Sequence, residues 1–226
     1  MQRAAVIANP RVGAELGHLA PWFEARDFAV ERLVRDDVLP LDAADDADLL
    51  VLLGSVWTMT RTMDSAGDPP RAAAAIAAEE RIVRRRIGQD RPILGICFGG
   101  QLISHALGGR VTEQEDTFTA WEVPRTQIPE LRAPWLLLHQ DAFTVPPGAQ
   151  TLASAEHAPV AFRRGRAWGL QFHPEVDADI LARMFLDVGW PEERSSPYVE
   201  QARERAEANR ADALRLFDRF WSEVSR

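Results

Sequence analysis

The only cysteine in the chain, Cys97, is the first candidate for chemistry. An apolar run at 92–96 precedes it, and Gly99 and Gly100 follow closely. This pattern predicts a tight turn from a strand into a helix, where glycines permit unusual backbone angles and leave room for a substrate. At the carboxyl end of a parallel sheet, such a cysteine can attack a carbonyl carbon while helix N–H groups hold the oxyanion. The alternative is a small buried cysteine of the core.

A second segment could complete a nucleophilic site. His173 and Glu175 flank Pro174, directly after an apolar run at 168–172. A cysteine nucleophile needs a base that a third group holds in place. His173 would take and return the proton, and Glu175 would fix the histidine tautomer and stabilise the imidazolium. Either residue alone is more often structural or solvated, so the hypothesis depends on their combination with Cys97.

Two motifs in this order resemble those of the class I glutamine amidotransferase family: Gly95-x-Cys97-x-Gly99-x-Gln101, then His173-Pro174-Glu175. The resemblance spans roughly residues 4–188, and the wider sequence is similar to stand-alone relatives of the amidotransferase domain of GMP synthase. It implies an α/β fold with a flavodoxin-like, doubly wound, mostly parallel sheet and added antiparallel strands. It also implies a triad of Cys97, His173 and Glu175 that hydrolyses glutamine to glutamate and ammonia through a γ-glutamyl thioester.

The same resemblance assigns an oxyanion hole. Its donors would be the backbone N–H of Phe98 and an N–H of the loop that begins at Gly54 and Ser55. In the family this loop usually reads Gly-Gly-Pro, whereas serine occupies the second position here. Serine tolerates a positive φ less well than glycine. The donor therefore comes from a shifted loop, or the hole forms only when substrate binds.

A third match concerns the substrate site. The segment 138–141 contains a His-x-Asp pattern that in the family lines the glutamine site, partly through backbone groups. The substrate-binding residues that the resemblance implies are Gln101, His139, Gln140 and Asp141. A metal reading of this segment is disfavoured because two ligands without a third do not make a site, and we expect no cofactor. Glu122 is a weaker candidate for a role near the pocket.

Strand-like and helix-like segments alternate in the first half, which predicts parallel strands with helices on both faces. Strands are expected at an edge (29–34), in the buried centre (49–53) and at 4–8 and 92–96. Helices are expected at 16–28, 71–87 and 101–107. In the second half a helix is expected at 177–188. The expected strands there, several of them antiparallel, are 110–115, 118–123, 136–139, 151–154, 160–163 and 168–172.

The C-terminal region is expected to be helical. A linker at 191–197 should lead into a charged helix from about Tyr198, in which Leu214, Phe217 and Trp221 form one apolar stripe. This stripe would pack on its own domain or form a partner or homodimer surface. We therefore predict an amidotransferase-like domain over 1–190 and a C-terminal helical extension over 191–226.

Composition restricts the class of partner. The 226 residues include 26 Lys+Arg and 34 Asp+Glu, and the net charge of -8 argues against binding nucleic acid or an anionic membrane. No apolar stretch reaches 18 residues, and Arg11, Glu15 and Glu24 interrupt any secretory signal pattern. These features predict a cytoplasmic protein.

Three functions remain open at the level of sequence. The protein could be a glutaminase that supplies ammonia to a separate synthetase subunit, because it shows no ATP loop of the Gly-x-x-x-x-Gly-Lys type. It could be a stand-alone hydrolase of a γ-glutamyl amide or peptide, with Trp57, Trp121 and Trp135 shaping a larger pocket or belonging to the core. The third hypothesis, a catalytically silent binding module, is disfavoured by the intact triad.

Overall fold

Five parallel strands form one side of the main sheet. The computed structural model describes residues 1–9, 15–35, 41–60 and 72–225. The strands order as β2 (Phe28–Val34), β1 (Gln2–Ala8), β3 (Leu49–Leu52), β4 (Ile93–Ile96) and β10 (Ala167–Leu170). This is the 2-1-3-4-5 order of flavodoxin-like sheets, so the predicted doubly wound fold is confirmed. As expected, β2 lies at the edge and β3 is buried along its whole length.

Antiparallel strands extend the sheet beyond β10 and form a second, smaller sheet. The extension is β9 (Pro159–Arg164), β8 (Gln150–Ser154) and β6 (Arg125–Thr126). The smaller sheet pairs β5 (Val111–Glu122) with β7 (Trp135–Phe143), and η2 (Pro129–Leu131) lies between them in sequence. The two strands expected at 110–115 and 118–123 are one long strand. The pairing register shifts between Glu113 and Phe118, which accounts for the break in the sequence pattern.

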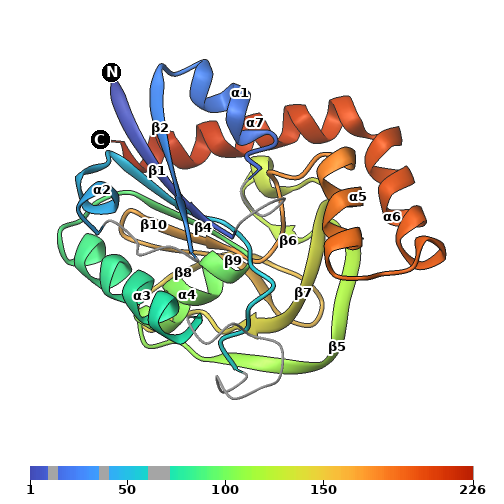
Figure 1. Ribbon diagram of the computed structural model, residues 1–226, viewed down its shortest axis with the longest axis horizontal. Coiled ribbons are helices and arrows are strands. Elements are labelled where there is room, and N and C mark those ends of the chain that lie inside the picture. The colour runs from blue at the N-terminus through green and yellow to red at the C-terminus, as the bar shows by residue number, and fades with distance from the viewer. Residues whose placement is uncertain (10–14, 36–40, 61–71, 226) are drawn as a thin grey trace.

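Helices cover both faces of the main sheet because side chains alternate along each strand. On one face, Ala4 and Val6 of β1 share a core with α1 (Leu19–Glu24) and α7 (Ala206–Val224). On the other, Ala5 and Ile7 share a core with α2 (Leu41–Asp46), α3 (Ala72–Gly88) and α4 (Phe98–Ala106). Figure 1 shows these two helical layers on either side of the strands.

The C-terminal region differs from the prediction at one point. The expected linker at 191–197 is wrong, because α6 (Glu192–Glu204) begins directly after Pro191, with Pro197 inside the helix. Pro197 is the sixth residue of α6, beyond the first turn, so it removes one backbone hydrogen bond from the helix. Together α5 (Ala178–Asp187) and α6 pack with Leu136 of β7 in a third core, at the right of Figure 1.

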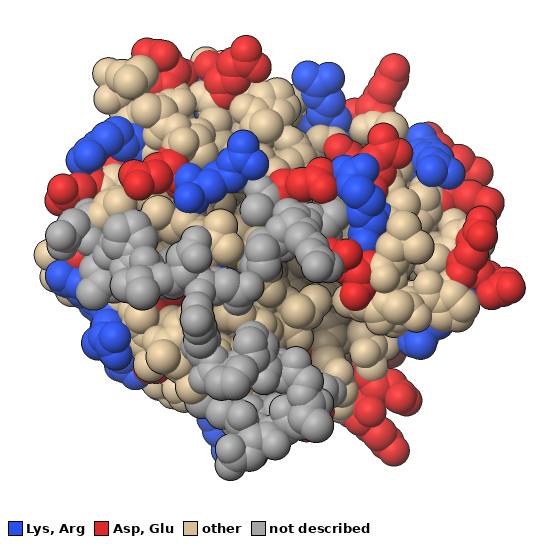
Figure 2. Space-filling view, viewed as in Figure 1, with Lys and Arg blue, Asp and Glu red and all other residues tan. Residues whose placement is uncertain are grey.

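The apolar stripe of α7 packs on the main sheet. Phe217 is buried, and Leu214 and Trp221 lie against the same core. Of the two alternatives that the sequence left open, packing on its own domain and a partner or homodimer surface, the structure shows the first. The division between 1–190 and 191–226 stays a prediction. In the part of the chain that the structure describes, no helix is long and apolar enough to span a bilayer. Figure 2 shows acidic and basic side chains interspersed on one face of the molecule.

Candidate active site

Three neighbouring parallel strands position the candidate site. β3, β4 and β10 pair in register, and their carboxyl ends lead into Gly54, Cys97 and His173 respectively. In doubly wound sheets ligands bind at this edge of the sheet. Residues far apart in sequence therefore meet because adjacent strands end side by side.

Cys97 occupies a strained turn between β4 and α4. Its φ of 51° and ψ of -107° lie outside the regions that residues with a Cβ readily adopt. The turn is held by the Cys97 N–H, which donates to Leu170 O at 2.8 Å, and by the Cys97 carbonyl, which accepts from Gln101 N at 3.0 Å. Gly99 and Gly100 have no Cβ, which allows α4 to begin directly after the cysteine. A methyl group at Gly99 would collide with the Leu52 carbonyl oxygen, and one at Gly100 with the Leu170 carbonyl oxygen.

His173 and Glu175 form a buried pair beside this cysteine. His173 Nδ1 lies 2.8 Å from Glu175 Oε1, and both residues are buried. Burial lowers the pKa of His173, but the charges of Glu175 and Cys97 raise it more, so that this pKa stands well above its usual value. The His173 ring and the Cys97 side chain both face Gly54, so they lie side by side. The structure thus brings the three predicted catalytic residues into one cluster.

The unpaired edge of β7 borders the same cluster. Leu136 O accepts a hydrogen bond from His173 N at 2.9 Å, and Leu138 O lies 3.6 Å from Cys97 Sγ. Backbone groups of residues two apart in a strand point to the same edge. The backbone of Gln140 therefore continues this row.

One residue that contacts the sulfur was not among the sequence-based site predictions. The Gln171 amide nitrogen lies 3.8 Å from Cys97 Sγ, and its amide oxygen is buried without a hydrogen-bond partner. Its position directly after β10, two residues before His173, was the available signal.

The loop after β3, for which the sequence predicts an oxyanion hole, lies against the cluster. A methyl group on Gly54 would lie 3.0 Å from His173 Cε1 and 3.7 Å from Cys97 Cβ, so Gly54 faces both residues. Ser55 is not among the non-glycine residues with positive φ, so the conformation that serine tolerates poorly is not adopted. Its hydroxyl donates to Asn9 Oδ1 at 3.2 Å and accepts from Trp57 N at 2.9 Å.

Two of the predicted substrate residues, Gln101 and Asp141, are in contact. Gln101 Nε2 donates to Asp141 O at 2.7 Å. The Asp141 carboxylate accepts from Met59 N at 3.1 Å and from Thr60 Oγ1 at 2.7 Å, so it holds these two residues of the loop after β3. Gln140 Nε2 donates to Glu113 Oε1 at 3.3 Å. The side chains of Gln101 and Asp141 therefore position the backbone of this region.

His139 differs from these residues because neither of its ring nitrogens makes a hydrogen bond of normal geometry, although the side chain is buried. Burial and the charges of His157 and His173 lower its pKa to about 4, and a weak interaction with the Asp141 backbone offsets this only in part. His139 is therefore neutral at pH 7.

This low pKa predicts an acid-sensitive contribution to stability. A group whose pKa falls on folding stabilises the fold above its unfolded pKa, near 6.5, and loses that contribution as pH falls towards the folded value. Between pH 7 and pH 5 we expect the wild type to lose about 2 kcal/mol more free energy of unfolding than His139→Gln. Urea denaturation of both proteins at the two pH values measures this difference. Equal losses would show that His139 titrates normally in the fold.

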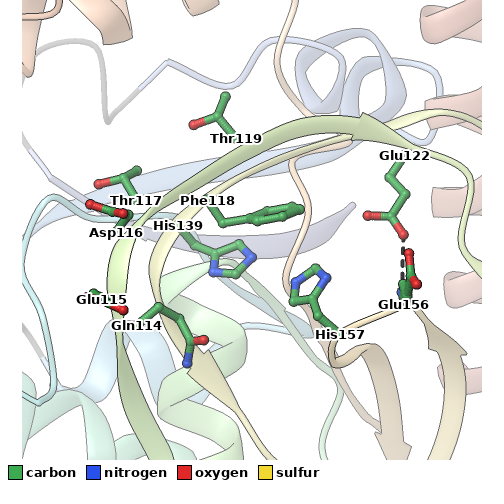
Figure 3. Close-up of a pocket in the computed structure, with 10 residues that line it drawn as sticks. All are labelled: Gln114, Glu115, Asp116, Thr117, Phe118, Thr119, Glu122, His139, Glu156 and His157. Atoms are coloured by element: carbon green, nitrogen blue, oxygen red, sulfur yellow. Dashed lines mark hydrogen bonds between the residues drawn. The ribbon is translucent and has the colours of Figure 1, made fainter.

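A cleft opens beside His139. It has a volume of about 700 Å³, and Figure 3 shows its lining residues. The Phe118 ring lies over His157 at 4.3 Å and His139 at 5.6 Å between centroids. Glu122 bounds the far end of the cleft, and its carboxylate accepts from Glu156 N at 3.3 Å. Residues 114–117 of β5, where the pairing register with β7 shifts, form one wall of the cleft. They include the carboxylates of Glu115 and Asp116.

The three tryptophans do not line this cleft. Trp57 and Trp135 are buried in the two cores of the main sheet. Trp121 packs against the core of α5 and α6 and donates from Nε1 to Tyr198 O at 3.2 Å. Of the two alternatives, the structure supports a packing role for these residues.

Comparison with known proteins establishes the family. The model of the glutamine amidotransferase class-I family matches residues 65–186, which is more than half of the chain. The chain therefore belongs to this family. The glutamine-hydrolyzing GMP synthase of Thermus thermophilus is 40% identical over 102 residues, which cover 41% of this chain and 20% of the relative. The chain thus spans about a fifth of the length of this relative.

Solved structures show the same fold over the whole chain. A glutamine amidotransferase from Thermotoga maritima superposes with a TM-score of 0.78 at 21% identity, covering 97% of each chain. A glutamine amidotransferase from Methylobacillus flagellatus superposes with a TM-score of 0.72 at 22% identity, covering 100% of this chain and 96% of the other.

Proposed function

We propose that Cys97, His173 and Glu175 form a catalytic triad that hydrolyses the γ-amide of glutamine. The observation that carries this proposal is the strained turn that holds Cys97 beside a buried histidine, which in turn contacts a buried carboxylate at 2.8 Å. Strain of this kind persists only where the surrounding structure enforces it, and it concentrates at functional sites. The family of the chain and the glutamine-hydrolysing activity named for its relative support the same reaction.

The reaction proceeds in two steps. The Cys97 thiolate attacks the carbonyl carbon of the γ-amide, and N–H groups of Ser55 or Gly54 and of Phe98 stabilise the oxyanion. The imidazolium of His173 protonates the leaving nitrogen, the C–N bond breaks, and ammonia departs from a γ-glutamyl thioester. His173 then takes a proton from water, the hydroxide attacks the thioester, and glutamate leaves as the C–S bond breaks. Glu175 holds the histidine in the required tautomer throughout.

We further propose that the ammonia is used by a separate synthetase subunit in the cytoplasm. The relative is a synthase about five times as long as the stretch it shares with this chain, so in that protein glutamine hydrolysis and synthesis belong to one polypeptide. Backbone groups of β7 near Gln140, together with the loop that Asp141 holds, would bind the amino-acid end of glutamine. The reaction itself would need only residues of the predicted 1–190 domain.

A second candidate is a stand-alone hydrolase of larger γ-glutamyl amides, and the cleft beside His139 favours it. A cleft of about 700 Å³ is larger than the departure of ammonia requires. Its lining includes the carboxylates of Glu115, Asp116, Glu122 and Glu156 and no arginine from the described part of the chain. An amide whose leaving amine carries a second, positively charged amino group would match this lining best.

Substrate preference separates the two candidates. The purified chain is assayed for glutamate release from glutamine and from γ-glutamyl amides of butylamine, 1,4-diaminobutane and 4-aminobutyrate, with Cys97→Ala as control. The primary proposal predicts slow, Cys97-dependent hydrolysis of glutamine and no preference for the larger amides. A much higher kcat/KM for a larger amide, above all the diamine, would establish the stand-alone hydrolase. No Cys97-dependent turnover of any amide would contradict both and favour a binding module.

A further inference from the structure

The guanidinium of Arg35 binds the oxyanion loop from behind. Arg35 directly follows β2, and its side chain is almost completely buried. It donates to two successive carbonyl oxygens of the loop, Leu53 O at 2.8 Å and Gly54 O at 2.9 Å. It also donates to Asn9 Oδ1 at 3.0 Å, the same oxygen that accepts from the Ser55 hydroxyl. One cation therefore connects the ends of β1, β2 and β3.

The same guanidinium also contacts Phe98, which carries the second proposed donor of the oxyanion hole. Arg35 Cζ lies 4.8 Å from the centroid of the Phe98 ring, and the Phe98 N–H is the second proposed oxyanion donor. A buried charge of this kind requires a partner, and Glu79 Oε1 accepts from Arg35 Nε at 2.8 Å. Glu79 lies on α3, away from the loop, so it balances the charge without occupying the hole.

The direction of these bonds determines where the loop N–H groups point. In a planar trans peptide the carbonyl and the N–H point in opposite directions. Because Arg35 holds the carbonyls of Leu53 and Gly54, the N–H groups of Gly54 and Ser55 point away from Arg35. Gly54 itself faces Cys97 and His173. A charged donor on each carbonyl also polarises the peptide and strengthens its N–H as a donor.

We propose that Arg35 is a positioning residue that orients the oxyanion hole of Cys97. The proposal rests on the function proposed above, and it gives that function a preformed hole even though serine replaces the second glycine of the family loop. Arg35 does not touch the substrate in this account. It acts by fixing the two peptides whose N–H groups meet the developing negative charge.

A second buried arginine provides a matched control. Arg86 is as deeply buried as Arg35 and also binds backbone carbonyls, those of Ala44, Asp45, Ala47 and Pro92. These carbonyls precede β3 and β4, at the opposite end of the sheet from Cys97. Arg35→Lys and Arg86→Lys therefore remove comparable bonds, but only the first removes them behind the proposed hole.

The test compares two reactions of Cys97 in both variants. Acylation by p-nitrophenyl acetate forms an oxyanion, whereas alkylation by iodoacetamide displaces iodide and forms none. For Arg35→Lys we expect the acylation rate and the kcat for glutamine to fall about 10- to 100-fold, with the alkylation rate and KM changed less than about twofold. For Arg86→Lys we expect an unchanged ratio of acylation to alkylation rates. Thermal denaturation checks that both variants remain folded.

An equal fall of both rates in Arg35→Lys, or an unchanged ratio, would overturn the proposal. Should that variant fail to fold, Asn9→Ala removes the acceptor shared by Arg35 and Ser55 and is expected to lower the same ratio severalfold. The ratio is measured without any glutamine turnover. If the wild type hydrolysed no glutamine, the proposed function would be contradicted. The ratio of acylation to alkylation rates would still test the role of Arg35.

Discussion

The Cys97→Ala variant is expected to lose at least about 10⁴-fold in kcat for glutamine and to remain folded. Removal of a covalent nucleophile leaves only the contribution of the oxyanion hole and of binding, which is why losses of this size are typical. Alanine keeps the Cβ and with it the backbone conformation at φ 51°, so the turn should survive. Glutamate release, measured together with the melting temperature, tests both statements.

The control for this variant is Cys97→Ser, which keeps a hydroxyl in the place of the sulfur. Because a serine hydroxyl is far less ionised than a thiol near neutral pH, this variant should also be nearly inactive. Activity of Cys97→Ala within tenfold of the wild type would mean that another group performs the reaction. A large fall in melting temperature would instead reveal a structural role for the cysteine.

Glu175→Gln is expected to lower kcat about 100-fold or more and to move the alkaline limb of the pH profile to lower pH. Glutamine in this position no longer selects the required histidine tautomer. The Glu175 carboxylate is also the largest of the influences that raise the pKa of His173 against the lowering effect of burial. The imidazolium that protonates the leaving nitrogen is lost as pH rises through this pKa. Without the carboxylate this loss occurs at a lower pH.

The pH dependence of kcat/KM for the wild type and Glu175→Gln measures this shift. A matched control is Glu80→Gln, because Glu80 is an acidic residue of α3 whose described contacts, Arg84 and His105, lie outside the triad. It should leave both the rate and the profile unchanged. A profile that falls at the same alkaline pH in Glu175→Gln and in the wild type would show that Glu175 does not determine the protonation of His173.

The cluster of Cys97, His173 and Glu175 was predictable because its signals are local. A buried strand, a cysteine and two small residues indicate the turn at Cys97, and a strand end followed by His173 and Glu175 indicates the base. Once the strands are recognised as parallel and adjacent, their carboxyl ends must lie together. The structure adds the distances and the strained φ, which no sequence pattern contains.

The network of Arg35 was not predictable because its partners lie far apart in sequence. Asn9, Gly54 and Glu79 each approach Arg35 only after β1, β2, β3 and α3 have packed. A charged residue at a strand end normally indicates solvent, and only the fold shows that Arg35 is buried. The long strand β5 was missed for a related reason, since its register shift at 114–117 interrupts the alternation of side chains.

Trapping the covalent intermediate tests the central claim most directly. The purified wild type is mixed with glutamine, quenched in acid within milliseconds to seconds, and analysed by mass spectrometry of the intact chain and of its peptides. We predict a γ-glutamyl adduct on the peptide that contains Cys97, which decays with release of glutamate and is absent from Cys97→Ala. Glutamate release without an adduct, or an adduct that persists in Cys97→Ala, would contradict the proposed thioester mechanism.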